Sequence, residues 1–292
     1  MVGPVFRAPP GWPPPPPGWL PPEGWQPDPA WPPAPAGWQF YLPEAEHPPA
    51  APVGASERIV LRREILVVLA FFPLPYIVSA VAGLAQALSG QSRARFPVVV
   101  AGHPVASAVL LALDLLAAFA PVLLIWYLLG RSGESLRAIG WDRTRPRSDA
   151  GWSLLLWPGT FVVNAVVGVW IVRTFPHAAF TLPTGHRLAL VYLLPGLLAA
   201  ANAGFVEEFV VTGYLLHRLE QLGVSRRRAL AISVAVRTSY HVYYGISALV
   251  MVPLGLLFGG FWQRKGRLIP IVAAHALYDA LLLGVAIGVT GH

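Results

Sequence analysis

Long apolar blocks separated by short basic gaps constrain the fold of this chain more than any other feature. From Ile65 onward seven such blocks can be separated, at residues 65–89, 104–129, 151–172, 188–217, 229–241, 246–262 and 268–289. Only 12% of the residues are charged, about half of the share in a soluble domain, and a membrane span needs about 20 apolar residues. We therefore predict an all-α fold, a polytopic transmembrane bundle of about seven helices. The fifth and sixth blocks are short, which favours helices packed inside the bundle with a bend from Tyr240 to Gly245.

Residues 1–58 have a different composition from the rest of the chain. They hold 19 of the 31 prolines and five of the eleven tryptophans, in repeated Gly-Trp-x-Pro phrases. Proline at this density disfavours helices and sheet ladders, so we predict a disordered or polyproline II tail. The phrases resemble the cytoplasmic leaders of many actinobacterial membrane proteins. Docking of the indoles to a partner or to the membrane interface and a solvated tail with no fixed role are both open, and the partner is unknown.

The basic residues predict the orientation of the spans. The net charge is +7, with twenty arginines and one lysine, and the arginines gather in the gaps 130–149, 218–228 and 263–267. Cytoplasmic loops of membrane proteins are enriched in this way, so the partner we expect is the lipid bilayer and not nucleic acid. The N-terminus is then cytoplasmic and the C-terminus external, in a multi-pass protein of the cell membrane, with external loops at 90–103 and 173–187.

Ionisable side chains inside the apolar blocks are the candidates for function, because a charge at mid-membrane costs several kcal/mol. Seven are candidates: Asp114, Glu207, Glu208, Arg237, His241, His275 and Asp279. All of them except Asp114 lie in the last 90 residues. Neighbours on a helix are about 100° apart, so one of the two glutamates can face a cavity while the other meets a partner. Arg237 needs a carboxylate, and Glu208 or Glu207 is the nearest in sequence. We interpret Asp114 as a hydrogen-bond acceptor in helix packing, with a role in the site as the alternative.

Three of the last four blocks place an ionisable side chain at a similar depth. At about 1.5 Å per helical residue, Glu207 lies roughly 16 Å, His275 about 10 Å and His241 about 20 Å from the basic end of its block. His275 and Asp279 are spaced i, i+4 and share a helix face, so the carboxyl group can orient the imidazole. We therefore predict one site that is built from three helices.

These motifs resemble those of the CPBP family, the CAAX-protease and bacteriocin-processing (Abi) intramembrane endopeptidases. The family pattern is Glu-Glu-x-x-x-Arg, then Phe-x-x-x-His, then His-x-x-x-Asn/Asp. Glu207-Glu208, His241, and His275 with Asp279 match it in order. The phrases Gly255-Leu-Leu-Phe-Gly259 and Arg267-Leu-Ile-Pro-Ile-Val-Ala-Ala-His275 also resemble the stretch before the third motif. The resemblance covers about residues 187–289. Together with the composition of residues 1–58, it predicts three parts: a tail at 1–58, N-terminal transmembrane helices at 59–186 and a catalytic core at 187–292.

The resemblance implies peptide hydrolysis of a membrane-associated protein or peptide. Glu207 would activate water with help from His241, and His275 would line the cavity and steady the tetrahedral intermediate. Glu208, Arg237 and Asp279 would support them, with Asp279 either protonated or orienting His275. No cofactor is required by these roles, but a metalloprotease with zinc on Glu207, His241 and His275 is an open alternative, although His-Glu-x-x-His is absent.

Two departures from the family pattern leave other functions open. Thr212 stands in the place of the arginine, and Arg237 in the place of the phenylalanine. We hypothesise that the guanidinium has moved from one helix to the other and still meets Glu208. The alternatives are a catalytically degenerate protein of the same fold, acting in self-immunity or as a scaffold, and an ion-coupled transporter. A transporter usually shows internal repeats, and this sequence shows none.

Overall fold

A computed structural model describes most of the chain. The described residues are 5–6, 8–13, 21–22, 24–35, 37–38, 40–42, 50, 52–89, 104–175 and 193–290. The chain divides into two compact units, residues 1–48 and residues 49–292. Helix α1 (Ala55–Phe71) contains the expected boundary at residue 58, and that boundary stays a prediction. The expected boundary at 186/187, the expected loop 90–103 and most of the loop 173–187 lie outside the described residues.

The first unit contains repeated tight turns in its described part. Strand β1 (Val5–Phe6) pairs antiparallel with β2 (Tyr41–Leu42), a ladder of two residues on each side. The backbone N–H groups of Trp12, Trp25 and Trp38 each donate to the carbonyl three residues earlier. The residue before each tryptophan is a glycine with φ between 79° and 88°, as a type II turn requires. No helix occurs among the described residues of this unit, as the proline content predicts, while the short ladder was not expected.

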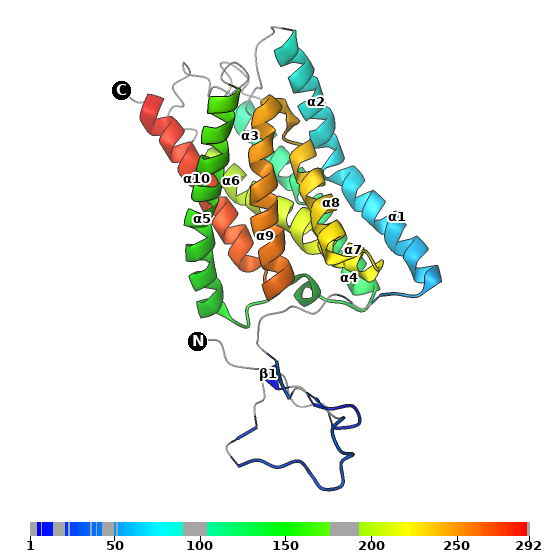
Figure 1. Ribbon diagram of the computed structural model, residues 1–292. Coiled ribbons are helices and arrows are strands. Elements are labelled where there is room, and N and C mark those ends of the chain that lie inside the picture. Colours follow the sequence, from blue (N-terminus) through cyan, green and yellow to red (C-terminus); the bar gives the residue numbers. More distant parts are fainter. Residues whose placement is uncertain are drawn as a thin grey trace. The chain divides into compact units, whose positions relative to one another are not determined.

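The described helices of the second unit follow the seven apolar blocks, but several blocks are broken into two elements. The elements after α1 are α2 (Leu74–Leu88), α3 (Pro104–Ala118), α4 (Ala120–Arg131), η1 (Leu136–Ile139), α5 (Pro146–Thr174), α6 (Leu193–Glu207), η3 (Glu208–Tyr214), α7 (Leu215–Gln221), α8 (Arg226–Ser239), η4 (Val242–Val250), α9 (Met251–Lys265) and α10 (Ile269–Thr290). The predicted all-α bundle is therefore confirmed (Figure 1).

Three helical stretches in the described residues are long and apolar enough to cross a bilayer. They are Ala112–Arg131, Pro146–Thr174 and Val242–Lys265, and the pair α1 and α2, bent by 46°, makes a fourth if it is one span. The last stretch contains the predicted bend. Gly245 has φ 60° and ψ −135°, a conformation in the left-handed half of the map that favours glycine, and it interrupts the helix between His241 and α9.

The three arginine-rich gaps lie at the same end of the second unit, the lower end in Figure 1. The N–H of Leu268 donates to Gly140 O at 2.9 Å, and Arg267 Nη1 donates to Asp142 at 2.7 Å, so the gaps after α4 and α9 are bonded together. Gln263 Nε2 donates to Arg226 O at 2.8 Å, which joins the third gap. The structure thus gathers the basic loops at one end, as the positive-inside interpretation requires.

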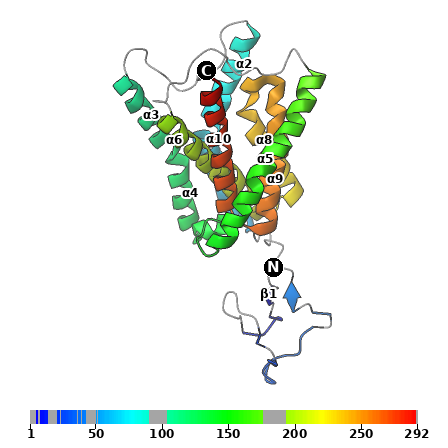
Figure 2. The same ribbon diagram turned by 90° about the vertical axis from the view of Figure 1, so that its left-hand side faces the viewer.

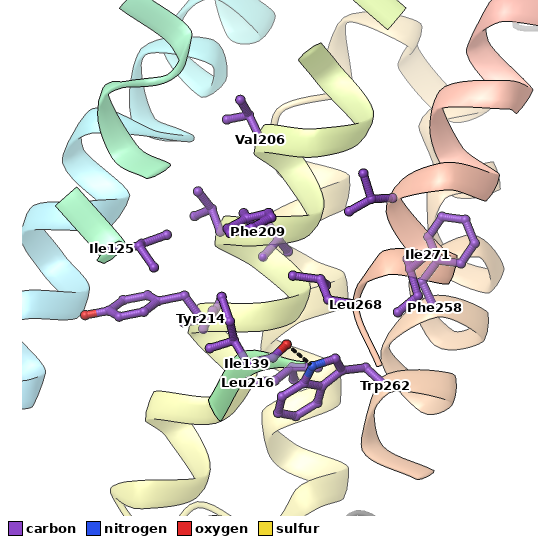
Figure 3. Packing of buried hydrophobic residues seen from close by; sticks show 14 of the residues in the cluster. Ile125, Ile139, Val206, Phe209, Tyr214, Leu216, Phe258, Trp262, Leu268 and Ile271 are labelled. Atoms are coloured by element: carbon purple, nitrogen blue, oxygen red, sulfur yellow. Dashed lines mark hydrogen bonds between the residues drawn. The ribbon is translucent and has the colours of Figure 1, made fainter. Parts of the chain in front are cut away.

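The core of the second unit lies where the glutamate helix meets its neighbours. Buried apolar side chains from α4, η1, η3, α9 and α10 interlock around Phe209 and Leu268 (Figure 3). Trp262 is fully buried, and its Nε1–H donates to Ile139 O at 2.9 Å. Because a buried indole N–H needs an acceptor, this bond fixes η1 against α9.

Small residues allow the helices of the site to approach closely. A Cβ on Gly259 would lie 2.4 Å from Leu230 and one on Gly255 would lie 3.0 Å from Val234, so both glycines of the Gly255–Gly259 phrase face α8. A Cβ on Gly204 would lie 2.8 Å from the backbone nitrogen of Ala276. Glycine at these positions therefore brings α9 against α8 and α6 against α10, which lies between α5 and α6 (Figure 2).

Candidate active site

The two adjacent glutamates sit at a change of helix type. Helix α6 ends at Glu207, and the π-helix η3 begins at Glu208. Short π-helical stretches inside α-helices occur frequently at functional sites. Glu208 is completely buried, and the side chain of Glu207 is 14% exposed. The two carboxylates therefore occupy different environments, as expected for neighbours on a helix.

Glu208 lies at the centre of a buried polar cluster. Arg237 Nη2 donates to its Oε2 at 2.7 Å, and the Thr212 hydroxyl donates to the same oxygen at 2.6 Å. His275 Nδ1 lies 2.7 Å from Oε1. One carboxylate thus joins residues from η3, α8 and α10, and both of its oxygens have partners. The hypothesis that the arginine of the histidine helix meets Glu208 predicts this contact, and the structure contains it.

Glu207 is held by a residue that the sequence analysis did not assign to the site. The Tyr240 hydroxyl donates to Glu207 Oε2 at 2.8 Å, and Arg237 Nη1 lies 3.5 Å from the same atom. Tyr240 is 5% exposed, which explains why its hydroxyl needs an acceptor. Its position three residues after Arg237 is the sequence signal, since i and i+3 share a helix face.

Thr212 is the second residue that was missed, because it was considered only as a departure from the family pattern. It lies four residues after Glu208, and Arg237 Nη2 also approaches its hydroxyl, at 3.2 Å. The hydroxyl therefore bridges the guanidinium and the carboxylate. Its i, i+4 spacing from Glu208 could have indicated this contact.

The histidines have defined orientations. His241 Nδ1 lies 3.0 Å from the carbonyl oxygen of Arg237, and because a carbonyl only accepts, Nδ1 carries the proton. In the neutral ring Nε2 is then the basic nitrogen. His275 presents Nδ1 to Glu208, and its Nε2 lies 3.6 Å from Asp279 Oδ2. That separation is longer than a hydrogen bond, and Asp279 remains 31% exposed on its side chain.

All six predicted site residues therefore belong to one set of contacts of 3.6 Å or less. The set runs from Glu207 through Arg237 to Glu208, His275 and Asp279, and His241 joins it at the Arg237 carbonyl. Phe258 covers it on the apolar side, with its ring centroid 5.9 Å from both the Arg237 guanidinium carbon and the His275 ring.

Asp114 does not join this set. It is exposed on α3, and no hydrogen bond to its carboxylate occurs among the described residues. The polar contact between α3 and α6 comes instead from Asn202, whose Nδ2 donates to Leu115 O at 3.1 Å. The predicted role of Asp114 as a packing acceptor is thus not seen.

The side chains of the candidate site can also be compared with the requirements of a metal site. Within the described part of the chain, no group of three or more His, Asp or Glu side chains is placed to hold a metal ion. His275 and Arg237 both bond to Glu208. Zinc binding by Glu207, His241 and His275 stays a prediction that the structure does not test.

Comparison with known families agrees with the motifs. A family model described as type II CAAX prenyl endopeptidase Rce1-like matches residues 189–281, a segment that contains all six predicted site residues. This match is consistent with the resemblance of the motifs to the CPBP family. The family match and the apolar helices indicate a membrane protein related to intramembrane proteases. No curated protein and no solved structure matches this chain significantly.

Proposed function

We propose that this chain is an intramembrane endopeptidase that uses Glu207 and His241 to activate water. The observation that supports the proposal is the set of contacts of 3.6 Å or less described above. In this set the Glu207–Glu208 pair, Arg237, His241 and His275 come together from three helices. Buried charges of this kind are rare in membrane helices and mark functional sites. The family match supports the class of reaction, and the residue roles are argued from the contacts.

Glu207 and His241 have the features that a base needs. Glu207 is the less buried glutamate, and only its Oε2 is bonded within the described residues. His241 has its Nδ1–H fixed on a carbonyl, which leaves Nε2 to accept a proton. Tyr240 connects the two, because its hydroxyl bonds to Glu207 and its ring centroid lies 4.6 Å from the His241 ring.

Glu208, Arg237 and Thr212 serve as positioning residues. Together they bond both oxygens of one carboxylate, and that carboxylate orients His275. With Nδ1–H donating to Glu208, the other nitrogen of His275 points toward Asp279. A protonated His275 or a protonated Asp279 can then donate a hydrogen bond to a developing oxyanion, which an ionised carboxylate cannot do.

The hydrolysis balances with these groups alone. Water attacks the peptide carbonyl carbon while Glu207 or His241 takes its proton, and the carbonyl oxygen becomes the oxyanion. The C–N bond then breaks as the same base returns the proton to the leaving nitrogen. The products are a new carboxyl group, which contains one oxygen from water, and a new amine.

Mapping of new protein termini tests the proposal without a known substrate. Membranes from cells that produce the full chain are incubated in H₂¹⁸O, and new C-termini and N-termini are identified by mass spectrometry. The comparison is between the unchanged chain, Glu207→Gln and the matched control Glu57→Gln, which removes an exposed carboxylate from α1. We expect ¹⁸O-containing cleavage products with the unchanged chain and with Glu57→Gln, and none above background with Glu207→Gln.

The same experiment separates the alternatives. If all three membranes give the same set of termini, although each variant folds as the unchanged chain does, the endopeptidase proposal is wrong. That result would favour a degenerate protein of the same fold. Normal unfolding temperatures of the purified variants establish that loss of cleavage is not loss of folding.

We also propose that the basic end of the second unit faces the cytoplasm of a cell membrane. The arginine-rich gaps lie together there, and positive loops remain on the cytoplasmic side during insertion. The N-terminus is then cytoplasmic and the C-terminus external.

A further inference from the structure

A pocket of about 690 Å³ opens at the basic end of the second unit, and its lining does not include Glu207 or Glu208. Its wall comes from the last turns of α4, from η1 and from the segment after η1. The side chains that matter for its chemistry are Trp126, Tyr127, Arg131, Arg137, Trp141 and Arg143. Cationic and aromatic groups thus line one concave surface.

The charges of the pocket do not cancel. Its two acidic residues are bonded to cations outside it, since Glu134 pairs with Arg218 at 2.5 Å and Asp142 with Arg267 at 2.7 Å. Arg131 pairs with Glu64. Arg137 and Arg143 are exposed, and neither has an ion pair among the described residues. Two guanidinium groups therefore remain available to an anion, and guanidinium suits phosphate because it donates two parallel hydrogen bonds.

The aromatic residues place the pocket at the membrane surface. Trp126 and Tyr127 are 63% and 61% exposed, on the last turns of the span Ala112–Arg131. They lie five and four residues before Arg131, respectively, which is roughly 6–8 Å along a helix. Exposed tryptophan and tyrosine at the end of a span are typical of the headgroup level of a bilayer.

The inner wall of the pocket is rigid. The Trp141 ring lies 5.1 Å from the Phe205 ring and 4.7 Å from the Phe209 ring, so it packs on the helix that carries the glutamates. The η1 segment is held by the Trp262 bond to Ile139 and by the Leu268 bond to Gly140. Because these bonds reach into the core, the pocket is a fixed part of the bundle.

We propose that this pocket binds the phosphoryl headgroup of an anionic phospholipid. Arg137 and Arg143 contact the phosphate, and Trp126 and Tyr127 lie along the glycerol backbone and the first part of the acyl chains. Basic pockets at the cytoplasmic side of membrane helices suit such headgroups. The site is separate from the proposed peptidase site, and binding does not require cleavage activity.

Native mass spectrometry of the full chain tests this proposal. The protein is released from detergent micelles after addition of phosphatidylglycerol or phosphatidylcholine with the same acyl chains, and retained lipids are counted. The double variant Arg137→Gln/Arg143→Gln is compared with Arg62→Gln/Arg147→Gln, which removes two exposed arginines that do not line the pocket. The two double variants have the same net charge.

We expect the unchanged chain to retain phosphatidylglycerol in preference to phosphatidylcholine. Each arginine near a phosphate contributes about fivefold to affinity, so loss of both in the pocket should weaken phosphatidylglycerol binding on the order of 25-fold. The matched control should stay within about twofold to threefold of the unchanged chain. Millimolar inorganic phosphate should not displace the lipid, because the acyl chains and aromatic residues add to its binding.

Three results would overturn the proposal. The first is equal retention of the two lipids by the unchanged chain. The second is an equal loss in the two double variants, which would mean that only net charge matters. The third is full displacement by inorganic phosphate, which would identify a soluble anion as the ligand. Equal unfolding temperatures of the two double variants in detergent without lipid show that both fold.

Discussion

Arg237 and Glu208 lie 29 residues apart in the chain, and their side chains form a 2.7 Å ion pair that is 1% and 0% exposed. The guanidinium comes from the histidine helix α8, whereas the family pattern has its arginine four residues after the second glutamate, where this chain has Thr212. This contact is the one that the hypothesis of a relocated guanidinium predicts.

Removal of this arginine should destabilise the whole bundle. Breaking a buried pair by deleting one partner leaves an uncompensated charge and costs about 3–5 kcal/mol. We expect Arg237→Gln to lower the free energy of unfolding in detergent by this amount, as measured by chemical denaturation. Arg147→Gln is the control, because Arg147 is exposed and has no ion pair in the described residues. A loss below about 1 kcal/mol would contradict the assigned pairing.

An arginine at position 212, where the family pattern has one, should restore part of the free energy of unfolding that is lost when Arg237 is replaced. Arg237→Phe alone leaves Glu208 without its cation, and Thr212→Arg/Arg237→Phe supplies a new one from four residues away on η3. We expect the double variant to be more stable than Arg237→Phe in the same denaturation measurement. If Thr212→Arg makes Arg237→Phe less stable still, the two positions do not compensate for each other.

The Tyr240 hydroxyl should contribute to both stability and cleavage. A hydrogen bond to a charged group contributes about 1.5–3 kcal/mol, so Tyr240→Phe should lower the free energy of unfolding by that amount. The yield of Glu207-dependent cleavage products should fall as well, because Glu207 loses its shortest contact. Tyr127→Phe removes an exposed hydroxyl and should change neither quantity. Unchanged stability and cleavage in Tyr240→Phe would exclude a role for this bond.

Close packing of α6 on α10 should depend on Gly204. A Cβ there would meet the backbone of Ala276, next to His275, at 2.8 Å, so Gly204→Ala must push the two helices apart. We expect a loss of about 1–3 kcal/mol, typical of overpacking. In contrast, a Cβ on Gly151 in α5 meets nothing within 4 Å, and Gly151→Ala should be neutral or stabilising by up to about 1 kcal/mol. Equal effects of the two changes on unfolding would show that α6 and α10 can separate freely.

The Asp142–Arg267 pair predicts a loss of stability in acid. Burial raises the pKa of Asp142, but hydrogen bonds from Arg267 and Thr144 outweigh it and hold the pKa at about 2, below the ordinary 3.8. A depressed pKa contributes stability that is complete above pH 3.8 and is lost as the pH falls toward 2. We expect a contribution of about 1–2 kcal/mol after allowance for solvent screening.

Subtraction isolates this contribution from that of other carboxylates. Burial raises the pKa of Glu134, but bonds from His217 and Arg218 lower it overall, so the unchanged chain loses stability from more than one group. The difference in unfolding free energy between the unchanged chain and Asp142→Asn should shrink between pH 4 and pH 2. A difference that stays constant over this range would show that Asp142 is not ionised in the pair.

The bundle could be predicted from the sequence because lipid imposes simple rules on block length and loop charge. The Arg237–Glu208 contact followed from the rule that a buried arginine needs a carboxylate. That rule alone does not choose between Glu208 and Glu207, because the rotation of a helix within a bundle depends on packing and on the helix type at Glu208; the comparison with the family pattern chose Glu208. Tyr240 was missed because a hydroxyl has many possible acceptors, and Thr212 because it was considered only as a departure from the pattern. The role of Asp114 stays a prediction, because an acidic residue on an apolar helix does not reveal which face meets lipid.

The π-helix at Glu208–Tyr214 sets the rotation of the site carboxylates relative to the following helix. A π-turn contains one residue more than an α-turn in each hydrogen-bonded loop, so η3 absorbs one extra residue in an otherwise regular helix. If the same residues formed a regular α-helix, the extra residue would rotate Glu207 and Glu208 by about 100° relative to α7. The carboxylates would then leave Arg237, Tyr240 and His275 although every one of these residues was still present.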